Sequence, residues 1–284
     1  MAEFEEELSN EEKLKIAQHY LLSCPPGQFS EVLSDVKKIV DEEVLPDNVV
    51  AGIARVSNLR HSKLVTAPSG RKVVISQAGE IDLTHYYDPA EDATFELDHL
   101  TLQTTPSEET PSNQDEGLSE LRRGLQRRLS DYVRSFYPGE NAAVGVYAVN
   151  GNLTVVITGE RINLKNFWSG KWTSSWALAV NDGNATLSGD IKIHVHYFED
   201  GNLQMQTNKN VQANSFNYSN ENALFDKVVA IIQEQEAALQ QGLEEMYTNM
   251  NNETFRSMRR IMPVTRTKMD WNVNSVRMVR QVRK

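Results

Sequence analysis

The chain contains 284 residues, of which 39% are hydrophobic and 24% are charged, so it can bury a sizeable core and wholesale disorder is excluded. No apolar run approaches the roughly 18 residues that a membrane-spanning helix needs, and the acidic start (residues 3–7) lacks the basic and then apolar pattern of a secretory signal. Cys24 is the only cysteine, which excludes an internal disulfide and a Cys-x-x-Cys zinc or redox site. We therefore expect a soluble protein of a reducing, cytoplasmic compartment.

The charge is unevenly distributed along the chain. The net charge is −10, but residues 254–284 carry nine basic side chains against one acid, Asp270, so this segment is +8 and the remainder is −18. So acidic a body would repel a phosphate backbone, which disfavours a general nucleic-acid binder. A basic extension on an acidic body indicates an arm that binds an acidic surface.

Three short helices are predicted within residues 1–60. Residues 9–12 (Ser-Asn-Glu-Glu) have the spacing of a capping box, and apolar residues then recur at helical spacing up to the proline pair at 25–26. A second helix is predicted after Ser30, and a third begins near Pro46. Short helices with tight breaks predict an antiparallel helical stalk.

A small intermediate β layer and a polar loop are predicted for residues 61–117. Strand candidates at 72–76, 81–83 and 94–97 are separated by glycine or Asp-Pro turns. Residues 103–117 are polar and contain proline, which predicts a mobile loop.

An apolar stripe predicts a helix over residues 118–136. The opposite face of this helix carries four arginines within seven residues: Arg122, Arg123, Arg127 and Arg128. Such a run could be a binding patch, but we favour a solvated face that neighbouring acids at positions 116, 120 and 131 neutralise.

Five strands are predicted next, at 144–149, 153–157, 172–180, 185–198 and 203–207. Asn-Gly and Asp-Gly pairs stand between several of them, and these pairs favour tight hairpins because they tolerate positive φ. Short connections leave no room for crossovers, so the sheet is predicted to be an antiparallel meander. Alternation along 191–198 indicates one packed face and one partly polar face.

A long helix is predicted from Ser219 to about Met250 and would span roughly 48 Å. Five strands at about 4.8 Å each are narrower than this helix. The helix therefore either overhangs into solvent or crosses onto a second sheet. Its continuous apolar stripe favours the second arrangement, and hence a partner subunit.

The usual catalytic signatures are absent, including the nucleophile elbow, the phosphate-binding loop, the dinucleotide fingerprint and His-Glu-x-x-His, so we do not expect an enzyme or a cofactor. His194 and His196 have metal-compatible spacing on one strand face, but the sequence offers no third ligand at a suitable spacing, so we favour a structural or surface pair.

Trp168, Trp172 and Trp176 could stack single-stranded bases. We favour instead Trp172 and Trp176 anchoring the sheet against the helices.

The strongest functional candidate is the C-terminal segment, residues 253–284. Its first part predicts a short amphipathic helix that ends at Pro263, after which basic and apolar residues continue to interleave. Arginines supply long-range attraction, whereas methionine and tryptophan supply burial, which a merely solubilising tail would not need. Such a segment can dock in a groove of a partner or lie on an anionic membrane. The selected binding residues are Arg256, Met258, Arg259, Arg260, Met262, Arg266, Lys268 and Trp271.

Three long motifs make the chain similar to a known family. They are Asn-Phe-Trp-Ser-Gly-Lys-Trp-x-Ser-x-Trp at 166–176, Val-His-Tyr-Phe-Glu-Asp-Gly-Asn at 195–202, and Met-Arg-Arg-Ile-Met-Pro-Val-Thr-Arg-Thr-Lys-Met-Asp-Trp-Asn at 258–272. Together with the opening at 9–29, they resemble the α subunit of F-actin capping protein, in unbroken order over nearly the whole chain.

The resemblance implies an α+β fold and an obligate α/β heterodimer. Each subunit would contribute five strands to one ten-stranded sheet, with long helices across it, a helical stalk and a C-terminal tentacle. Such a dimer binds barbed ends of actin filaments and blocks both addition and loss of subunits, without a nucleotide of its own.

The resemblance also assigns roles within the C-terminal segment. Arg256, Arg260 and Arg266 match the actin-binding basic positions of the family, with Arg259 and Lys268 flanking them. Trp271 matches the tail tryptophan that supports tight binding. Phosphoinositides, ankyrin-type inhibitors and capping-protein-interaction peptides are regulators in the family.

We accordingly expect a stalk at 1–60, a β layer and loop at 61–117, a central sheet with flanking helices at 118–252, and an actin-binding tentacle at 253–284. The alternative is a nucleic-acid- or anionic-membrane-binding module that acts through the same basic tail.

Overall fold

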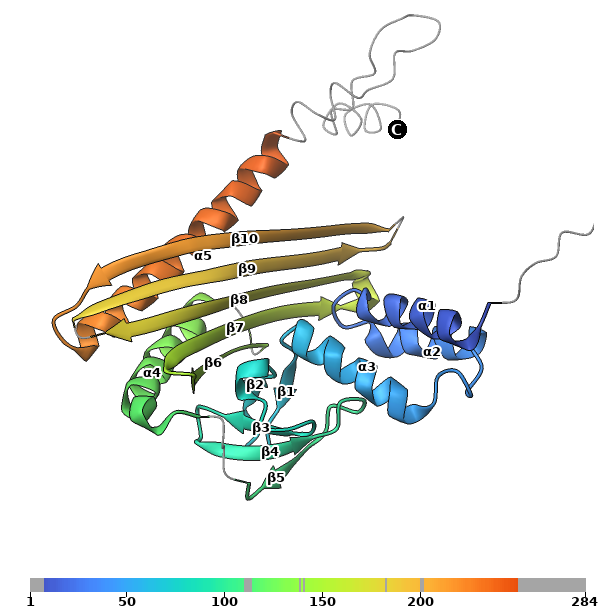
Figure 1. Ribbon diagram of the computed structural model, residues 1–284. Helices are drawn as coiled ribbons and strands as arrows, with labels where there is room; N and C mark the ends of the chain where they lie inside the picture. Colours follow the sequence, from blue (N-terminus) through green and yellow to red (C-terminus); the bar gives the residue numbers. More distant parts are fainter. Residues whose placement is uncertain are drawn as a thin grey trace, which may run out of the picture. The chain divides into compact units, whose positions relative to one another are not determined.

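The computed structural model describes residues 8–109, 114–137, 139, 141–181, 183–199 and 202–249. The chain divides into two compact units, Met1–Ile231 and Ile232–Lys284. The first unit holds helices, two small sheets and a five-stranded antiparallel sheet (Figure 1). This mixture confirms the predicted α+β class.

The three predicted N-terminal helices are present as α1 (Asn10–Leu22), α2 (Phe29–Ile39) and α3 (Asp47–Arg60). α1 begins with the predicted capping box, in which Ser9 Oγ accepts from the Glu12 amide at 3.3 Å and the Glu12 carboxylate accepts from the Ser9 amide at 2.9 Å. The shared core of these helices consists of Ala17, Leu21, Val36, Leu45, Val50 and Ile53.

Two small sheets follow the helices. β1 (Leu64–Thr66) pairs with β2 (Lys72–Val74), and a second sheet has the order β3 (His85–Asp88), β4 (Ala93–Leu97), β5 (Thr104–Ser107).

Two sequence expectations were wrong in this region. The predicted strand at 81–83 is a turn, because Asp82 Oδ1 accepts from the amides of Thr84 and His85, both at 2.8 Å. The predicted loop at 103–117 contains β5, which lies at the edge of its sheet and so accommodates Pro106.

α4 (Ser119–Phe136) confirms the predicted helix, but its arginine face is not uniformly solvated. Arg122 is buried, with 3% of its side chain exposed, and donates to Asp92 Oδ1 at 2.6 Å and to the Pro89 carbonyl at 2.7 Å. Arg128 pairs with Asp226. The expected neutralisation by acids within the helix holds for Arg123, which contacts Glu120 at 2.8 Å and also Asp92. The partners of Arg122 and Arg128 were not predicted, because they lie far from these arginines in the sequence.

The central sheet is the predicted meander, with order β10-β9-β8-β7-β6 and every pair antiparallel. Its strands are β6 (Ala142–Val149), β7 (Asn152–Asn163), β8 (Trp168–Asn181), β9 (Asn184–Tyr197) and β10 (Leu203–Asn217). At the β6–β7 hairpin, Asn150 and Gly151 adopt φ of 53° and 73°, which the tight turn requires.

The two faces of the sheet differ as predicted. Residues on the first face, here called the helix-covered face, are fully buried and include Leu153, Val155, Ile157, Trp176, Leu178 and Ile191. Tyr137, directly after α4, lies so close to Gly159 that a methyl group there would approach its ring to 2.7 Å. α4 also packs beside the start of α5 (Glu221–Asn249), where Phe225 lies against Gly124 (Figure 1).

The opposite face, here called the polar face, carries hydroxyl, amide and charged side chains on β8, β9 and β10. Near β6 and β7 it is apolar, because Val156 and Tyr147 pack there against Leu64 and Val74 of the small β1–β2 sheet. The polar part of this face is therefore the part that lies nearer to β10.

Candidate functional site

The eight predicted binding residues of the C-terminal segment lie outside the described residues. They are Arg256, Met258, Arg259, Arg260, Met262, Arg266, Lys268 and Trp271. Their role in actin binding stays a prediction.

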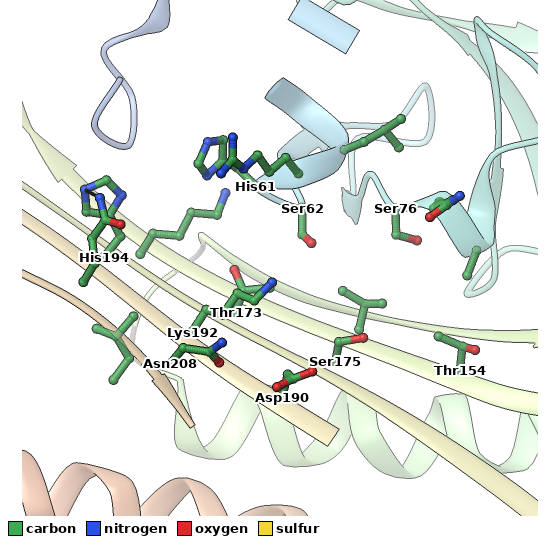
Figure 2. Close-up of a pocket in the computed structure, with 18 of the residues that line it drawn as sticks. His61, Ser62, Ser76, Thr154, Thr173, Ser175, Asp190, Lys192, His194 and Asn208 are labelled. Carbon is green, nitrogen blue, oxygen red and sulfur yellow. Dashed lines mark hydrogen bonds between the residues drawn. The ribbon is translucent and has the colours of Figure 1, made fainter. Parts of the chain in front are cut away.

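Within the first unit, a pocket of about 1160 Å³ opens over the polar face. Its floor comes from β7 to β10, and its walls come from the end of α3 and from residues 76–80. Figure 2 labels residues from both sides: His61 and Ser62 at the α3 end, Ser76, and from the strands Thr154, Thr173, Ser175, Asp190, Lys192, His194 and Asn208.

A buried cluster of charge lies at one end of this pocket. Lys171 on β8 donates to Glu160 Oε2 on β7 at 3.2 Å, and Lys63 Nζ lies 3.6 Å from the other oxygen of the same carboxylate. The side chains of Lys171 and Glu160 are 6% and 10% exposed. Burial lowers the pKa of the Lys171 ammonium to about 8, although the Glu160 charge opposes this effect. One carboxylate thus faces two ammonium groups, a costly arrangement at this depth.

The two imidazoles near the pocket, His61 and His194, have different surroundings. Burial, followed by the charge of Lys171, lowers the pKa of His61 to about 4, so this ring is neutral at pH 7. His194 Nε2 lies 3.4 Å from Gln204 Oε1 and 3.3 Å from Gln206 Nε2. The pocket is a polar concavity lined mainly by hydroxyl, amide, imidazole and charged side chains.

His194 and His196 have separate structural environments, which confirms the interpretation favoured from sequence. His196 Nδ1 lies 2.8 Å from Gln28 Nε2, and its Nε2 lies 3.2 Å from Asn202 Oδ1. Both ring nitrogens are thereby engaged, and the first bond ties the loop between α1 and α2 to β9.

The tryptophan cluster is part of the packed sheet. Trp176 is 1% exposed and its ring covers Gly189 on the helix-covered face. Trp172 lies on the same face, since Gly159 is its register partner on β7. Trp176 is buried, as the favoured interpretation expects, and this buried ring cannot stack on bases.

The two edge strands of the central sheet, β6 and β10, differ in the hydrogen bonding of their outer edges. Along β6, Gln126 Oε1 accepts from the Val146 amide at 2.7 Å, and Gln114 Oε1 accepts from the Ala148 amide at 3.0 Å. These side chains close the β6 edge. β10 is 15 residues long and pairs only with β9 within the described sheet. The long edge strand is therefore the place where another chain could extend this sheet.

Sequence reasoning missed the Lys63–Glu160–Lys171 cluster and the closed β6 edge. The cluster had a readable signal, because Glu160 and Lys171 become register partners once β7 and β8 are paired through their connection. The glutamine contacts with β6 left no such signal in the sequence, because a side chain that pairs with a strand edge need not stand at any fixed spacing from that strand.

Comparisons with known proteins agree with one another. The sequence matches the family model of the F-actin capping protein alpha subunit over residues 17–281. It is 31% identical to an F-actin-capping protein subunit alpha of Caenorhabditis elegans, covering 94% of this chain and 95% of that protein, and 30% identical to one of Dictyostelium discoideum, covering 93% and 94%. The solved homodimeric actin capping protein alpha subunit of Plasmodium berghei superposes with a TM-score of 0.74 at 25% identity, covering 89% of this chain and 98% of that one.

No helix in the described part of the chain is both long enough and apolar enough to cross a bilayer.

Proposed function

Because the chain belongs to the F-actin capping protein alpha subunit family, we propose that it pairs with a capping protein beta subunit and caps the barbed ends of actin filaments, blocking both addition and loss of actin subunits. The observation that carries the proposal is the extent of the family match, since residues 17–281 include the sheet, α5 and most of the basic C-terminal segment. The protein would act in the cytoplasm, on the actin cytoskeleton.

The proposed actin-binding element is the C-terminal segment, residues 253–284. Its charge of +8 from residue 254 onward contrasts with the −18 of the rest of the chain, so an acidic actin surface would attract this segment rather than the body. Electrostatic attraction acts at long range and raises the association rate, with a strong dependence on salt. The interleaved methionines and Trp271 would then bury and slow dissociation.

The proposed partner surface is the open β10 edge. A second five-stranded sheet that paired with β10 would satisfy the outward backbone groups of a 15-residue strand. The glutamine contacts along β6 disfavour pairing at the other edge. The beta subunit is the proposed occupant. A second copy of this chain is the competing one, because the Plasmodium relative is described as homodimeric.

Seeded actin elongation tests the capping function. The full-length chain is co-expressed with a beta subunit, and the mass of the complex shows whether it is a heterodimer. Nanomolar complex should stop barbed-end growth, whereas the same complex that lacks residues 254–284 should remain folded but cap far more weakly. Equal capping by both complexes would refute the role of the segment.

Paired variants separate the two stages of capture. Reversing Arg260 and Arg266 to glutamate should slow association by on the order of tenfold at low salt. Reversing Arg280 and Arg283 is the matched control, because it changes the same charge outside the motif at 258–272. Replacing Trp271 by alanine should accelerate dissociation by about 30-fold, the effect of losing about 2 kcal/mol at an interface hot spot. Kinetics with the two effects exchanged would contradict this division of roles.

The basic segment is also the proposed target of anionic phosphoinositides, which would compete with actin for it. Competition should disappear in the Arg260 and Arg266 variant.

A further inference from the structure

Three side chains of metal-ligating type converge beside the three-stranded sheet, far from the C-terminal segment in sequence. Asp82 lies in the turn before β3, His85 is the first residue of β3, and Glu109 follows β5 by two residues. One ligand atom from each lies within 4.8 Å of the other two. We propose that Asp82, His85 and Glu109 bind a divalent transition-metal ion of the zinc type.

The spacing of the ligand atoms fits such an ion. His85 Nδ1 lies 2.9 Å from Asp82 Oδ2 and 3.8 Å from Glu109 Oε2. Zinc bound at about 2.0–2.1 Å in a tetrahedron holds its ligand atoms about 3.3 Å apart. The two observed distances lie on either side of that value, so small side-chain rotations are enough to bring the ligands into position.

The arrangement of charge also favours a bound cation. His85 Nδ1 can donate a single hydrogen, yet three carboxylate oxygens lie within 3.8 Å of it: both oxygens of Asp82, at 2.9 and 3.0 Å, and one of Glu109. The ligand oxygens of Asp82 and Glu109 lie within 4.8 Å of each other, so the two carboxylates repel, and a cation between them would relieve this repulsion. A neutral imidazole can offer its lone pair to a metal at that point.

The donor set selects the class of ion. One imidazole nitrogen and two carboxylate oxygens suit zinc and its first-row neighbours, whereas calcium and magnesium prefer oxygen ligands alone. Three protein ligands leave a fourth position for water, as in open zinc sites.

Two of the ligands are held in place without the metal. Asp82 Oδ1 accepts two backbone amides at 2.8 Å, which fixes the carboxylate beside His85. The Glu109 backbone is anchored because its carbonyl accepts from Thr94 Oγ1 at 2.7 Å and its amide donates to Ser107 Oγ at 3.2 Å. The site is also open to solvent, since the side chains of Asp82 and Glu109 are 49% and 50% exposed. A bound ion would join the turn before β3 to the segment after β5.

Metal titration of the full-length chain, in the assembly in which it purifies, tests the proposal. Calorimetry with zinc chloride should show one saturable site that calcium and magnesium do not occupy. Cobalt should give the intense visible bands of a four-coordinate site. His85→Gln and Glu109→Gln should each weaken zinc binding by at least about tenfold, because the loss of a ligand costs no less than the loss of a supporting contact.

Matched variants keep this test independent of folding and of capping. Glu108→Gln removes the same charge from the neighbouring residue, and His19→Gln removes an imidazole from α1; both should bind zinc normally. An unchanged melting temperature of the metal-free His85→Gln protein shows that it is folded. The proposal is overturned if the chain shows no saturable zinc site, or if Glu108→Gln weakens binding as much as Glu109→Gln. None of these measurements involves actin, so their outcome is independent of the proposed capping function.

Discussion

Replacing Lys171 by methionine should stabilise the fold, whereas replacing its partner Glu160 by glutamine should destabilise it. The two residues form one buried ion pair at 3.2 Å, so a simple count of salt bridges predicts that both changes are harmful. The pKa of Lys171 argues otherwise. It falls from an ordinary value of 10.5 to about 8, which means that burial costs the ammonium more than Glu160 returns.

The size of the expected change in stability follows from the lowered pKa of Lys171. At about 1.4 kcal/mol per pKa unit, the charged form of Lys171 costs the folded state on the order of 3 kcal/mol, and methionine of similar length removes this cost. Because Glu160 keeps Lys63 as a counter-charge at 3.6 Å, we expect Lys171→Met to raise the free energy of unfolding by about 1–3 kcal/mol at pH 7. Glu160→Gln leaves the buried Lys171 ammonium and the partly buried Lys63 ammonium without their shared counter-charge and should lower it by about 3 kcal/mol.

The pH dependence supplies a second readout. Between pH 8 and 10.5 the unfolded chain holds a proton on Lys171 that the folded chain has released, so stability should rise with pH across this window. In Lys171→Met this contribution should be absent. Urea unfolding at pH 7 and pH 10 measures both effects, with Lys192→Met as the matched control on the exposed part of the polar face, expected within about 0.5 kcal/mol of the parent. If Lys171→Met destabilises the fold as much as Glu160→Gln does, the reasoning is refuted.

Three further predictions follow from the described contacts. Arg122→Ala should lower the free energy of unfolding by about 3 kcal/mol because it breaks a buried pair, whereas Arg127→Ala, exposed on the same helix, should change it by less than about 0.5 kcal/mol; equal effects in urea melts would contradict this account. His61 has a folded pKa of about 4, below its unfolded value of 6.5, so stability should fall as pH drops through this window, and His61→Gln should flatten the acid limb of a melting-temperature profile. Addition of a beta subunit should slow amide exchange in β10 but leave the outer amides of β6 unchanged; unaltered exchange in β10 would exclude that edge as the interface.

Local patterns predicted most of the fold. The Ser9–Glu12 box and the Asn150-Gly151 hairpin are contacts between near neighbours, and each is found where its spacing places it. The alternation along β9 likewise predicted a buried Ile191 beside an exposed Lys192. Such features depend on residues a few positions apart, which is why a single sequence reveals them.

The errors concern contacts between distant parts of the chain. Arg122 was interpreted as solvated because its partner Asp92 lies 30 residues earlier, in a turn that the sequence does not place beside α4. Alternation on β9 inverts at its end, where His196 is buried and Tyr197 is 39% exposed, because the loop that carries Gln28 covers the polar face there. In both cases tertiary packing outweighs local pattern.

The candidate functional residues also fall into a group that local sequence predicts and a group that depends on tertiary pairing. The C-terminal segment could be selected from charge and apolar spacing alone, because its composition departs so strongly from the rest of the chain. The Asp82–His85–Glu109 cluster could not be completed, because Asp82 and His85 are neighbours but Glu109 reaches them only through the pairing of β3, β4 and β5.

The most direct test of the proposed function is barbed-end elongation measured filament by filament, with the complex of this chain and a beta subunit, at two salt concentrations. Capping should begin at a rate that falls steeply with salt and that drops further when Arg260 and Arg266 are reversed, while the control at Arg280 and Arg283, which changes the same charge outside the motif, should slow capping less. Capping that is insensitive to salt and equal in all three complexes would contradict the proposal that the basic segment leads the encounter with actin.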